Sequence, residues 1–376
     1  MNSLSFAKPS ELRFDNERLE VAYKMLDQWT SGECPVIPGA AILVGKKEKV
    51  LEPRFFGFQN PGSSAERIRR DGIFLLASIT KPIVYLSAMK LVEKGLLSLV
   101  DPVTYYIPEF SAHHKAETLI LHLFTHTSGL PDMLEDDIEL RRRHAPLSRF
   151  IHGAIHDTQL LFRPGSDLRY QSMGTLIVSE IIQRISGTTI HDFIRQEVFD
   201  PLGMCSTALG SASLDKNRLV AVETPSYQDG GDFGWNSSYW RELGVPWGGC
   251  FSTPEDLGII CQLMLNGGCN NGVRILSPSS VEVMSTNRLD TLPDLPESIA
   301  RTQPWGIGWQ LNHSGTTHSW GDLLGRKVYG HTGATGTMLW VDPQRDGFCV
   351  ILTTAELTHS RHRLIRLSNI IASSFR

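Results

Sequence analysis

A serine and a lysine three positions apart, Ser78 and Lys81, form the first candidate reactive pair in this sequence. An apolar run at 73–77 precedes them, and a broad apolar helical face follows as far as Gly95, so the pattern predicts that Ser78 lies at the N-terminus of a helix. The first N–H groups of a helix lack internal partners and favour an oxyanion. Because Lys81 would lie on the same helix face as Ser78, the pair could be a serine nucleophile with its base, provided that the surroundings lower the lysine pKa.

The Ser-x-x-Lys spacing alone does not establish this chemistry. It also occurs at Ser5, Ser87 and Ser213. At position 78 it equally fits a capping serine followed by a surface lysine. Other motifs must therefore decide between the two interpretations.

Two later segments supply further candidate residues. Tyr170-Gln171-Ser172 immediately precedes an amphipathic stretch, 173–185, which is typical of a helix and ends at Gly187. His331-Thr332-Gly333 ends a predicted strand, and Ala334 begins the next turn. Taken singly, Tyr170 also fits a core or capping aromatic residue, and His331 fits a histidine that is satisfied within a strand.

The three motifs, in this order, resemble those of the serine β-lactamase-like hydrolases, which include class C β-lactamases, D-alanyl-D-alanine peptidases and related esterases. That family carries Ser-x-x-Lys, then Tyr-x-Asn or Tyr-x-Ser, then Lys-Thr-Gly or His-Thr-Gly. The resemblance extends over roughly residues 38–354 and includes three shorter sequence segments. These are Leu123-Phe124-Thr125-His126-Thr127-Ser128-Gly129-Leu130, Gly248-Gly249 followed by 252–257, and Trp305-Gly306-Ile307-Gly308-Trp309.

The resemblance implies that Ser78 attacks an acyl carbonyl and forms an acyl-enzyme, while Lys81 and Tyr170 share the proton transfers. Which of the two takes the first proton stays open at this point. The backbone N–H groups of Ser78 and Ala334 would form the oxyanion hole, usually the largest contribution in acyl transfer. No cofactor is implied.

Two departures from the family pattern bear on the substrate. His331 replaces the lysine that most β-lactamases and peptidases of the family use to hold a substrate carboxylate, and histidine is largely neutral at pH 7. Ser172 replaces an asparagine that could bind a substrate amide. We therefore expect Ser172 and the segment His331-Thr332-Gly333 to contact a neutral ester with a small or medium acyl group.

Several aromatic residues crowd the segment before Gly248, namely Trp235, Tyr239, Trp240 and Trp247. They either line an apolar acyl pocket or pack two lobes of the protein together. The first possibility would make the three tryptophans part of the substrate-binding site.

Four functions are compatible with these motifs. A cofactor-free serine carboxylesterase agrees best with His331. A β-lactamase or D-amino-acid peptidase would use the same residues on amides, and a transacylase would pass the acyl group to an alcohol. A catalytically silent binding protein would keep only the fold, but the combination of Ser78, Lys81 and Tyr170 argues against it.

The elements predicted around the motifs define an α+β protein. Strands are expected at 39–44, 50–58, 306–311, 327–331, 337–342 and 348–354. Helices are expected at 16–29, 118–125, 134–144, 189–199, from Pro254 to just before Gly267, and at 364–375. The helix at 134–144 has acidic residues first and arginines last, and we interpret it as a solvated surface helix.

This arrangement predicts an antiparallel sheet flanked by helices, built from residues 1–101 and 250–376. A mainly helical domain at 102–249 would be inserted into it, with the active site between the two. The resemblance likewise implies the β-lactamase/transpeptidase-like fold.

Composition narrows the range of partners. The chain has 376 residues, 41% hydrophobic, with a net charge of −4, and it has no basic stripe for nucleic acid. Because residues 1–13 lack an export signal and no apolar stretch is long enough to span a bilayer, we expect a cytoplasmic protein that does not bind membranes. The six scattered cysteines predict buried free thiols.

Other chemistries find little support in the sequence. The chain contains no Gly-x-Ser-x-Gly elbow, phosphate-binding loop or His-Glu-x-x-His motif. His122 and His126 have the spacing of helical metal ligands, but no carboxylate ligand stands near them, so no metal site is expected. The oligomeric state stays open.

Overall fold

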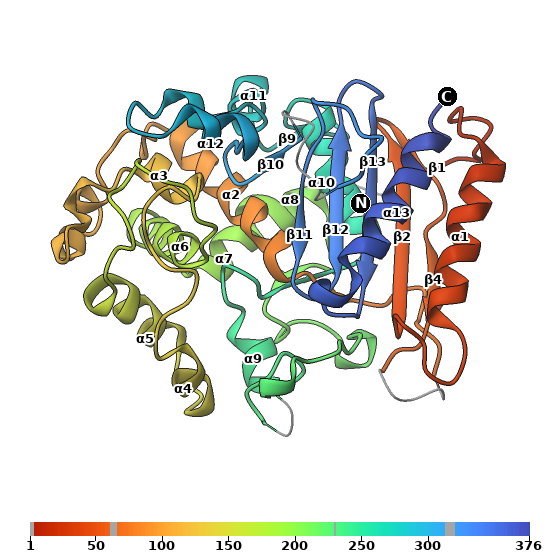
Figure 1. Ribbon diagram of the computed structural model, residues 1–376, viewed down its shortest axis with the longest axis horizontal. Helices are drawn as coiled ribbons and strands as arrows, with labels where there is room; N and C mark the ends of the chain where they lie inside the picture. Colours follow the sequence, from red (N-terminus) through yellow and green to blue (C-terminus); the bar gives the residue numbers. More distant parts are fainter. Residues whose placement is uncertain (1–3, 61–65, 229–230, 313–319) are drawn as a thin grey trace.

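The protein is built around one eight-stranded sheet (Figure 1). The computed structural model describes residues 4–60, 66–228, 231–312 and 320–376. The strand order is β1-β3-β2-β13-β12-β11-β10, with β4 also paired to β2, and the pairings are antiparallel except that of β1 with β3. The strands are β1 Ser5–Phe6, β2 Gly39–Lys46, β3 Lys49–Val50, β4 Arg54–Gly57, β10 Gln310–Leu311, β11 Tyr329–Gly333, β12 Thr337–Asp342 and β13 Gly347–Thr353.

Helices cover both faces of this sheet, because its central strands alternate apolar side chains between two hydrophobic clusters. Ile42 of β2 packs in one cluster with α1 (Asn16–Thr30) and α13 (Leu357–Ser374). Leu43 faces the other way, into the cluster that contains α10 (Pro254–Leu265). Figure 1 shows α1 and α13 lying beside each other along the sheet.

The remaining chain is mainly helical. Between residues 102 and 249, the part that the structure describes contains one strand, β6 (Ala208–Leu209), in a small sheet with β5 (Phe74–Leu75) and β7 (Cys250–Ser252). A separate pair is β8 Cys269–Asn270 with β9 Val273–Arg274. Further α-helices are α2 Thr80–Glu93, α3 Ile120–Phe124, α4 Asp137–Arg142, α5 Leu147–His152, α6 Met173–Ser186, α7 Ile190–Ile194, α8 Asp200–Leu202, α9 Ser238–Leu243, α11 Pro278–Met284 and α12 Glu297–Thr302. Short 3-10 helices span Ala77–Ile79, Val103–Tyr105, Pro108–Ser111, Lys115–Glu117, Lys216–Arg218, Ser226–Gln228 and Leu289–Thr291, and π-turns span Gly153–Asp157 and Arg195–Phe199.

The predicted α+β fold is confirmed, and so are several element ends. Helix α6 stops at Gly187, which has a φ of 70° that glycine adopts without strain. Helix α10 begins as predicted, with the Thr253 hydroxyl accepting a hydrogen bond from the backbone N–H of Asp256. The division into two domains stays a prediction.

Several predicted elements are shorter than expected, and the strand predicted at 50–58 is divided into β3 and β4. The helix predicted at 118–125 covers only Ile120–Phe124, and the strand at 306–311 covers only Gln310–Leu311. Gly308, with a φ of 74°, breaks the second segment, because this backbone conformation cannot continue a strand.

The interpretation of 134–144 as a solvated helix face is correct only in part, because most of its charged side chains, such as Glu135 and Arg142, are exposed but two are buried. Asp137 and Arg141 of α4 are each only 5% exposed, and Asp137 Oδ2 pairs with Arg141 Nε at 2.9 Å. The Arg141 guanidinium lies 3.8 Å from the ring centre of Trp240, which covers it. An i, i+4 charge pair is typical of surface helices. Here Trp240, which lies about a hundred positions further along the chain, covers the arginine of the pair.

The prediction for the cysteines is correct only in part. All six are free, but Cys34 and Cys205 are exposed, whereas Cys250, Cys261 and Cys349 are buried. Among the described residues, no helix combines the length and apolarity needed to cross a membrane.

Candidate active site

Ser78 lies at the junction between a strand and a long helix. It sits in the 3-10 turn Ala77–Ile79, one step before α2 begins at Thr80, so the predicted helix N-terminus is correct to within a turn. Ala77 has a φ of 48°, a left-handed conformation that residues other than glycine rarely adopt. Strained backbone of this kind is often concentrated at functional sites.

The hairpin of β11 and β12 holds this turn in place. Thr335 Oγ1 donates to the carbonyl oxygen of Leu75, and Thr337 Oγ1 donates to that of Leu76, each at 2.8 Å. A Cβ on Gly333 would lie 2.2 Å from the Leu76 carbonyl oxygen, so only glycine lets β11 pass so close. The backbone that carries Ser78 is therefore fixed against the strand that carries His331.

Lys81 is fully buried beside Ser78. Its Nζ lies 3.2 Å from Ser78 Oγ and donates a 3.0 Å hydrogen bond to the carbonyl oxygen of Trp247. Burial lowers the pKa of Lys81 to about 8, and the carboxylate of Asp132 opposes this decrease. About a tenth of Lys81 is therefore neutral near pH 7 and about half near pH 8, and the neutral amine is the form that a base requires.

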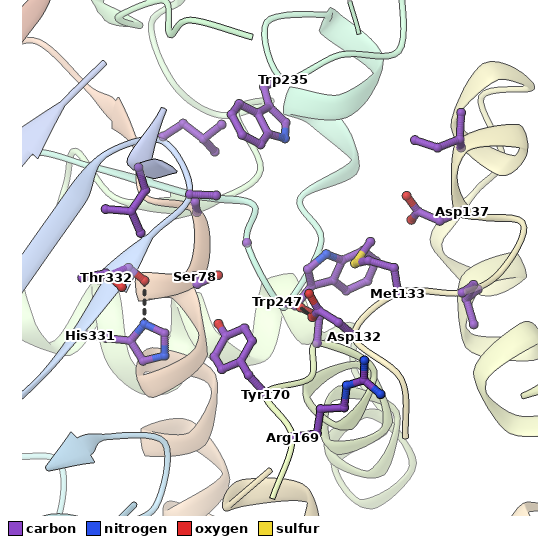
Figure 2. A pocket seen from close by; sticks show the side chains of 18 of the residues that line it. Ser78, Asp132, Met133, Asp137, Arg169, Tyr170, Trp235, Trp247, His331 and Thr332 are labelled. Carbon is purple, nitrogen blue, oxygen red and sulfur yellow. Dashed lines mark hydrogen bonds between the residues drawn. The ribbon is translucent and has the colours of Figure 1, made fainter. Parts of the chain in front are cut away.

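Tyr170 lies next to the same pair. The Lys81 Nζ is 4.8 Å from the centre of the Tyr170 ring, and Figure 2 shows the Tyr170 hydroxyl pointing towards Ser78. Burial raises the pKa of Tyr170 well above 10, and the Ser78 hydroxyl partly opposes the rise. The phenol is therefore protonated, and among the described residues its hydroxyl has no hydrogen-bond partner of normal geometry.

His331 is a neutral hydrogen-bond acceptor at this site. Its Nδ1–H donates a 2.7 Å hydrogen bond to the carbonyl oxygen of Thr332, which leaves Nε2 without a proton (Figure 2). Burial, and secondarily the charge of Lys81, lower the pKa of His331 to about 3. Position 331 therefore carries no positive charge at neutral pH.

Ser78, Tyr170 and His331 border a cavity of about 1030 Å³, and Lys81 is not among the residues that line it. Figure 2 shows Ser78, Tyr170 and His331 along one side and Asp137 on the opposite side. The other sequence-predicted site residues that line the cavity are Ser172, Thr332, Ala334, Trp235, Trp240 and Trp247, whereas Gly333 lies behind the lining. The tryptophans both line the cavity and pack into the core, since Trp240 and Trp247 are buried against each other.

Two residues of the site were not assigned a role from the sequence. Asp132 is exposed in the cavity and accepts a 2.7 Å hydrogen bond from the Ser172 hydroxyl. The His126 ring packs at a tilt against the Tyr170 ring, with centroids 4.6 Å apart. In the sequence, His126 lies within the family-like segment from Leu123 to Leu130, and Asp132 lies just after the end of that segment.

The histidines considered as metal ligands have other partners. His122 Nδ1 accepts a hydrogen bond from the backbone N–H of Leu119, and His126 Nδ1 accepts one from that of Gln171. In the described part of the chain, no three His, Cys, Asp or Glu side chains are grouped so that they could hold a metal ion.

The fold and this site define a serine hydrolase with the β-lactamase/transpeptidase-like fold. Residues 32–372 match the sequence profile of the Beta-lactamase family, and the chain belongs to that family. An uncharacterised protein of Mycobacterium tuberculosis is 28% identical over 347 residues, covering 81% of this chain and 80% of its own.

Two solved structures share the fold. A penicillin-binding protein homologue from Caulobacter crescentus superposes with a TM-score of 0.77 at 19% identity, over 95% of this chain and 98% of its own. EstCE1, described as a hydrolase with promiscuous acyltransferase activity, has a TM-score of 0.76 at 17% identity, over 96% and 99%. At these identities the likeness concerns the fold alone.

Proposed function

We propose that this chain is a serine carboxylesterase that forms an acyl-enzyme on Ser78 and prefers neutral esters. The observation that carries the proposal is the state of His331, which is buried, uncharged and committed to the Thr332 carbonyl. A lysine in this position would hold a substrate carboxylate, whereas the lone pair of His331 repels one. The cavity of about 1030 Å³ accommodates a medium-sized acyl ester.

The pKa values favour Lys81 as the first base. Neutral Lys81 takes the Ser78 proton as Oγ attacks the ester carbonyl carbon, and the backbone N–H groups of Ser78 and Ala334 stabilise the oxyanion. Tyr170 then donates its proton to the departing alkoxide and regains one from the Lys81 ammonium, so the alcohol leaves neutral. Water repeats the sequence in reverse on the acyl-enzyme and releases the carboxylic acid.

The test compares p-nitrophenyl acetate and butyrate with a chromogenic cephalosporin and a D-alanyl peptide. The expected result is ester turnover well above lactam or peptide turnover, abolished in Ser78→Ala. Mass spectrometry after a fluorophosphonate probe should show one adduct, on Ser78. Equal ester turnover in Ser78→Ala would rule out the assignment, and the absence of an adduct would favour a silent binding protein.

A peptidase or β-lactamase is the second candidate, because arginines also border the cavity. Arg142, Arg169 and Arg361 line it, and any of them could bind a carboxylate in place of position 331. Turnover of the cephalosporin or the D-alanyl peptide above that of both esters would favour this candidate. A transacylase, as in the description of EstCE1, would instead be indicated by faster product release when a simple alcohol is added.

A further inference from the structure

One residue outside the cavity lining holds the chain on both sides of Tyr170. The carbonyl oxygen of His126 accepts a 3.0 Å hydrogen bond from the backbone N–H of Arg169. The Nδ1 atom of His126 accepts a 3.3 Å hydrogen bond from the backbone N–H of Gln171. The backbone N–H groups of both sequence neighbours of Tyr170 are therefore bonded to the same residue.

The imidazole of His126 also packs directly on the Tyr170 ring. The ring centroids are 4.6 Å apart at an interplanar angle of 36°. Trp305 lies against His126 in an edge-to-face arrangement, with centroids 4.4 Å apart, and His126 is completely buried. The tyrosine ring thus rests on a side chain that has no free space to move.

The backbone of His126 is held in an unusual conformation. Its φ is 61°, in the left-handed region that costs most residues energy, although histidine and asparagine enter it more readily than others. This conformation is the one in which the carbonyl group and the ring of His126 both meet the Tyr170 segment. Strain of this kind persists only where the surrounding contacts over-determine it.

His126 keeps this arrangement because it stays neutral. Burial lowers its pKa well below 6.5, and the positive charge of protonated Lys81 lowers it further. Since Nδ1 accepts a hydrogen bond from Gln171, the ring proton is on Nε2.

The segment that follows His126 also contacts the chain after Tyr170, through Asp132. The Asp132 carbonyl oxygen accepts a 3.2 Å hydrogen bond from the backbone N–H of Ser172, and Asp132 Oδ1 accepts one from the Ser172 hydroxyl. The segment from His126 to Asp132 therefore contacts the Tyr170 segment at Arg169, Gln171 and Ser172, but the Tyr170 hydroxyl itself has no such anchor. The direction of the Tyr170 hydroxyl therefore depends on the contacts that hold the neighbouring backbone and the Tyr170 ring.

We propose that His126 is a positioning residue that aims the Tyr170 hydroxyl at Ser78 and at the leaving group of the substrate. The inference rests on the proposed function, because the aim of Tyr170 matters only if Tyr170 transfers a proton. His126 does not line the cavity and acts only through Tyr170. Misplacing a proton-transfer group by about 1 Å can cost roughly 100-fold in rate.

Two substitutions at His126 separate the effect of losing the imidazole contacts with the Tyr170 segment from the effect of straining the backbone at residue 126. His126→Gly removes the imidazole but accepts a φ of 61° without strain, whereas His126→Asn keeps an acceptor atom and tolerates the same conformation. We expect kcat to fall about 100-fold in His126→Gly with little change in KM, and by less than about tenfold in His126→Asn. His122→Ala is the control, because His122 makes the same kind of bond to a backbone N–H but serves Leu119.

A double-mutant cycle with Tyr170→Phe distinguishes positioning from general damage. Once Tyr170 lacks its hydroxyl, His126→Gly should cost little further activity, so the two effects should not multiply. The cycle is run on whichever ester, cephalosporin or D-alanyl peptide the wild-type protein turns over, with thermal unfolding followed in every variant. A wild-type preference for cephalosporin or peptide would count against the proposed function alone.

Three results would overturn the inference itself. One is an unchanged kcat in His126→Gly. Another is an equal loss in the presence and absence of the Tyr170 hydroxyl, and the third is a loss as large in His122→Ala. If His126→Gly does not fold, the same cycle with His126→Asn decides, because a positioning role predicts that even its smaller loss disappears in the Tyr170→Phe background.

Discussion

The Ser172 hydroxyl donates its hydrogen bond to Asp132 Oδ1 at 2.7 Å. The Ser172 side chain is thus turned towards the protein's own carboxylate. An asparagine amide here could select a substrate amide by hydrogen bonding, whereas an engaged serine hydroxyl has less capacity to do so. The contact also fixes a negative charge near Lys81, which has consequences for the pH dependence.

The first prediction concerns Lys81 and pH. Because burial lowers its pKa to about 8 and the neutral amine is the base, kcat/KM for p-nitrophenyl butyrate should rise with pH, reach half its maximum near pH 8 and level off above about pH 9. His126 and His331 stay neutral across this range and add no further step. Rates are corrected for spontaneous hydrolysis with Ser78→Ala, and a profile that is flat or falling between about pH 6 and pH 9 would contradict the role of Lys81.

The second prediction concerns the charge of Asp132. Its carboxylate raises the pKa of Lys81, so Asp132→Asn should lower that pKa further and move the acidic limb of kcat/KM to lower pH. Each half unit of decrease makes the neutral fraction of Lys81 about threefold larger on that limb. Ser172→Ala is the matched control, since it removes the hydrogen bond but keeps the charge. A limb that moves to higher pH in Asp132→Asn, or moves equally in both variants, would contradict this electrostatic account.

The sequence singles out Ser78, Lys81 and Tyr170 because each stands in a short motif beside a strongly patterned element, and the structure places the three side chains close together. His126 and Asp132 could not be assigned in this way. Their partners Gln171 and Ser172 lie 45 and 40 positions further along the chain, and only the fold brings them together. Local patterns report propensity and amphipathicity, but not which distant side chain a polar atom meets.

The buried Asp137–Arg141 pair on α4 also could not be recognised from local sequence patterns. This pair is the subject of the third prediction. Arg141→Met keeps most of the apolar stem but leaves the Asp137 carboxylate buried without its partner, which should lower the free energy of unfolding by about 3 kcal/mol near pH 7. Burial already raises the pKa of Asp137 above 3.8, and removing Arg141 should raise it further. The loss should therefore shrink as pH falls and the carboxyl group becomes protonated.

Urea unfolding at several pH values measures this loss. Arg142→Met is the control, because Arg142 is the exposed neighbour on the same helix and should change stability by less than about 0.5 kcal/mol. Equal stability of Arg141→Met and wild type at neutral pH would mean that solvent reaches Asp137 more freely than its 5% exposure indicates.

The last prediction returns to position 331, where charge should select the substrate. His331→Lys places an ammonium at the position that the family uses for substrate carboxylates, although His331 is only 3% exposed, so the longer side chain must reach into the cavity. A charge-assisted hydrogen bond contributes about 1.5–3 kcal/mol. The ratio of cephalosporin to p-nitrophenyl butyrate kcat/KM should therefore rise by roughly 10- to 100-fold.

His331→Gln, which is polar and uncharged, should leave the ratio within about threefold of wild type. If the two variants change the ratio equally, shape and not charge at position 331 selects the substrate, and the argument from His331 for neutral esters fails.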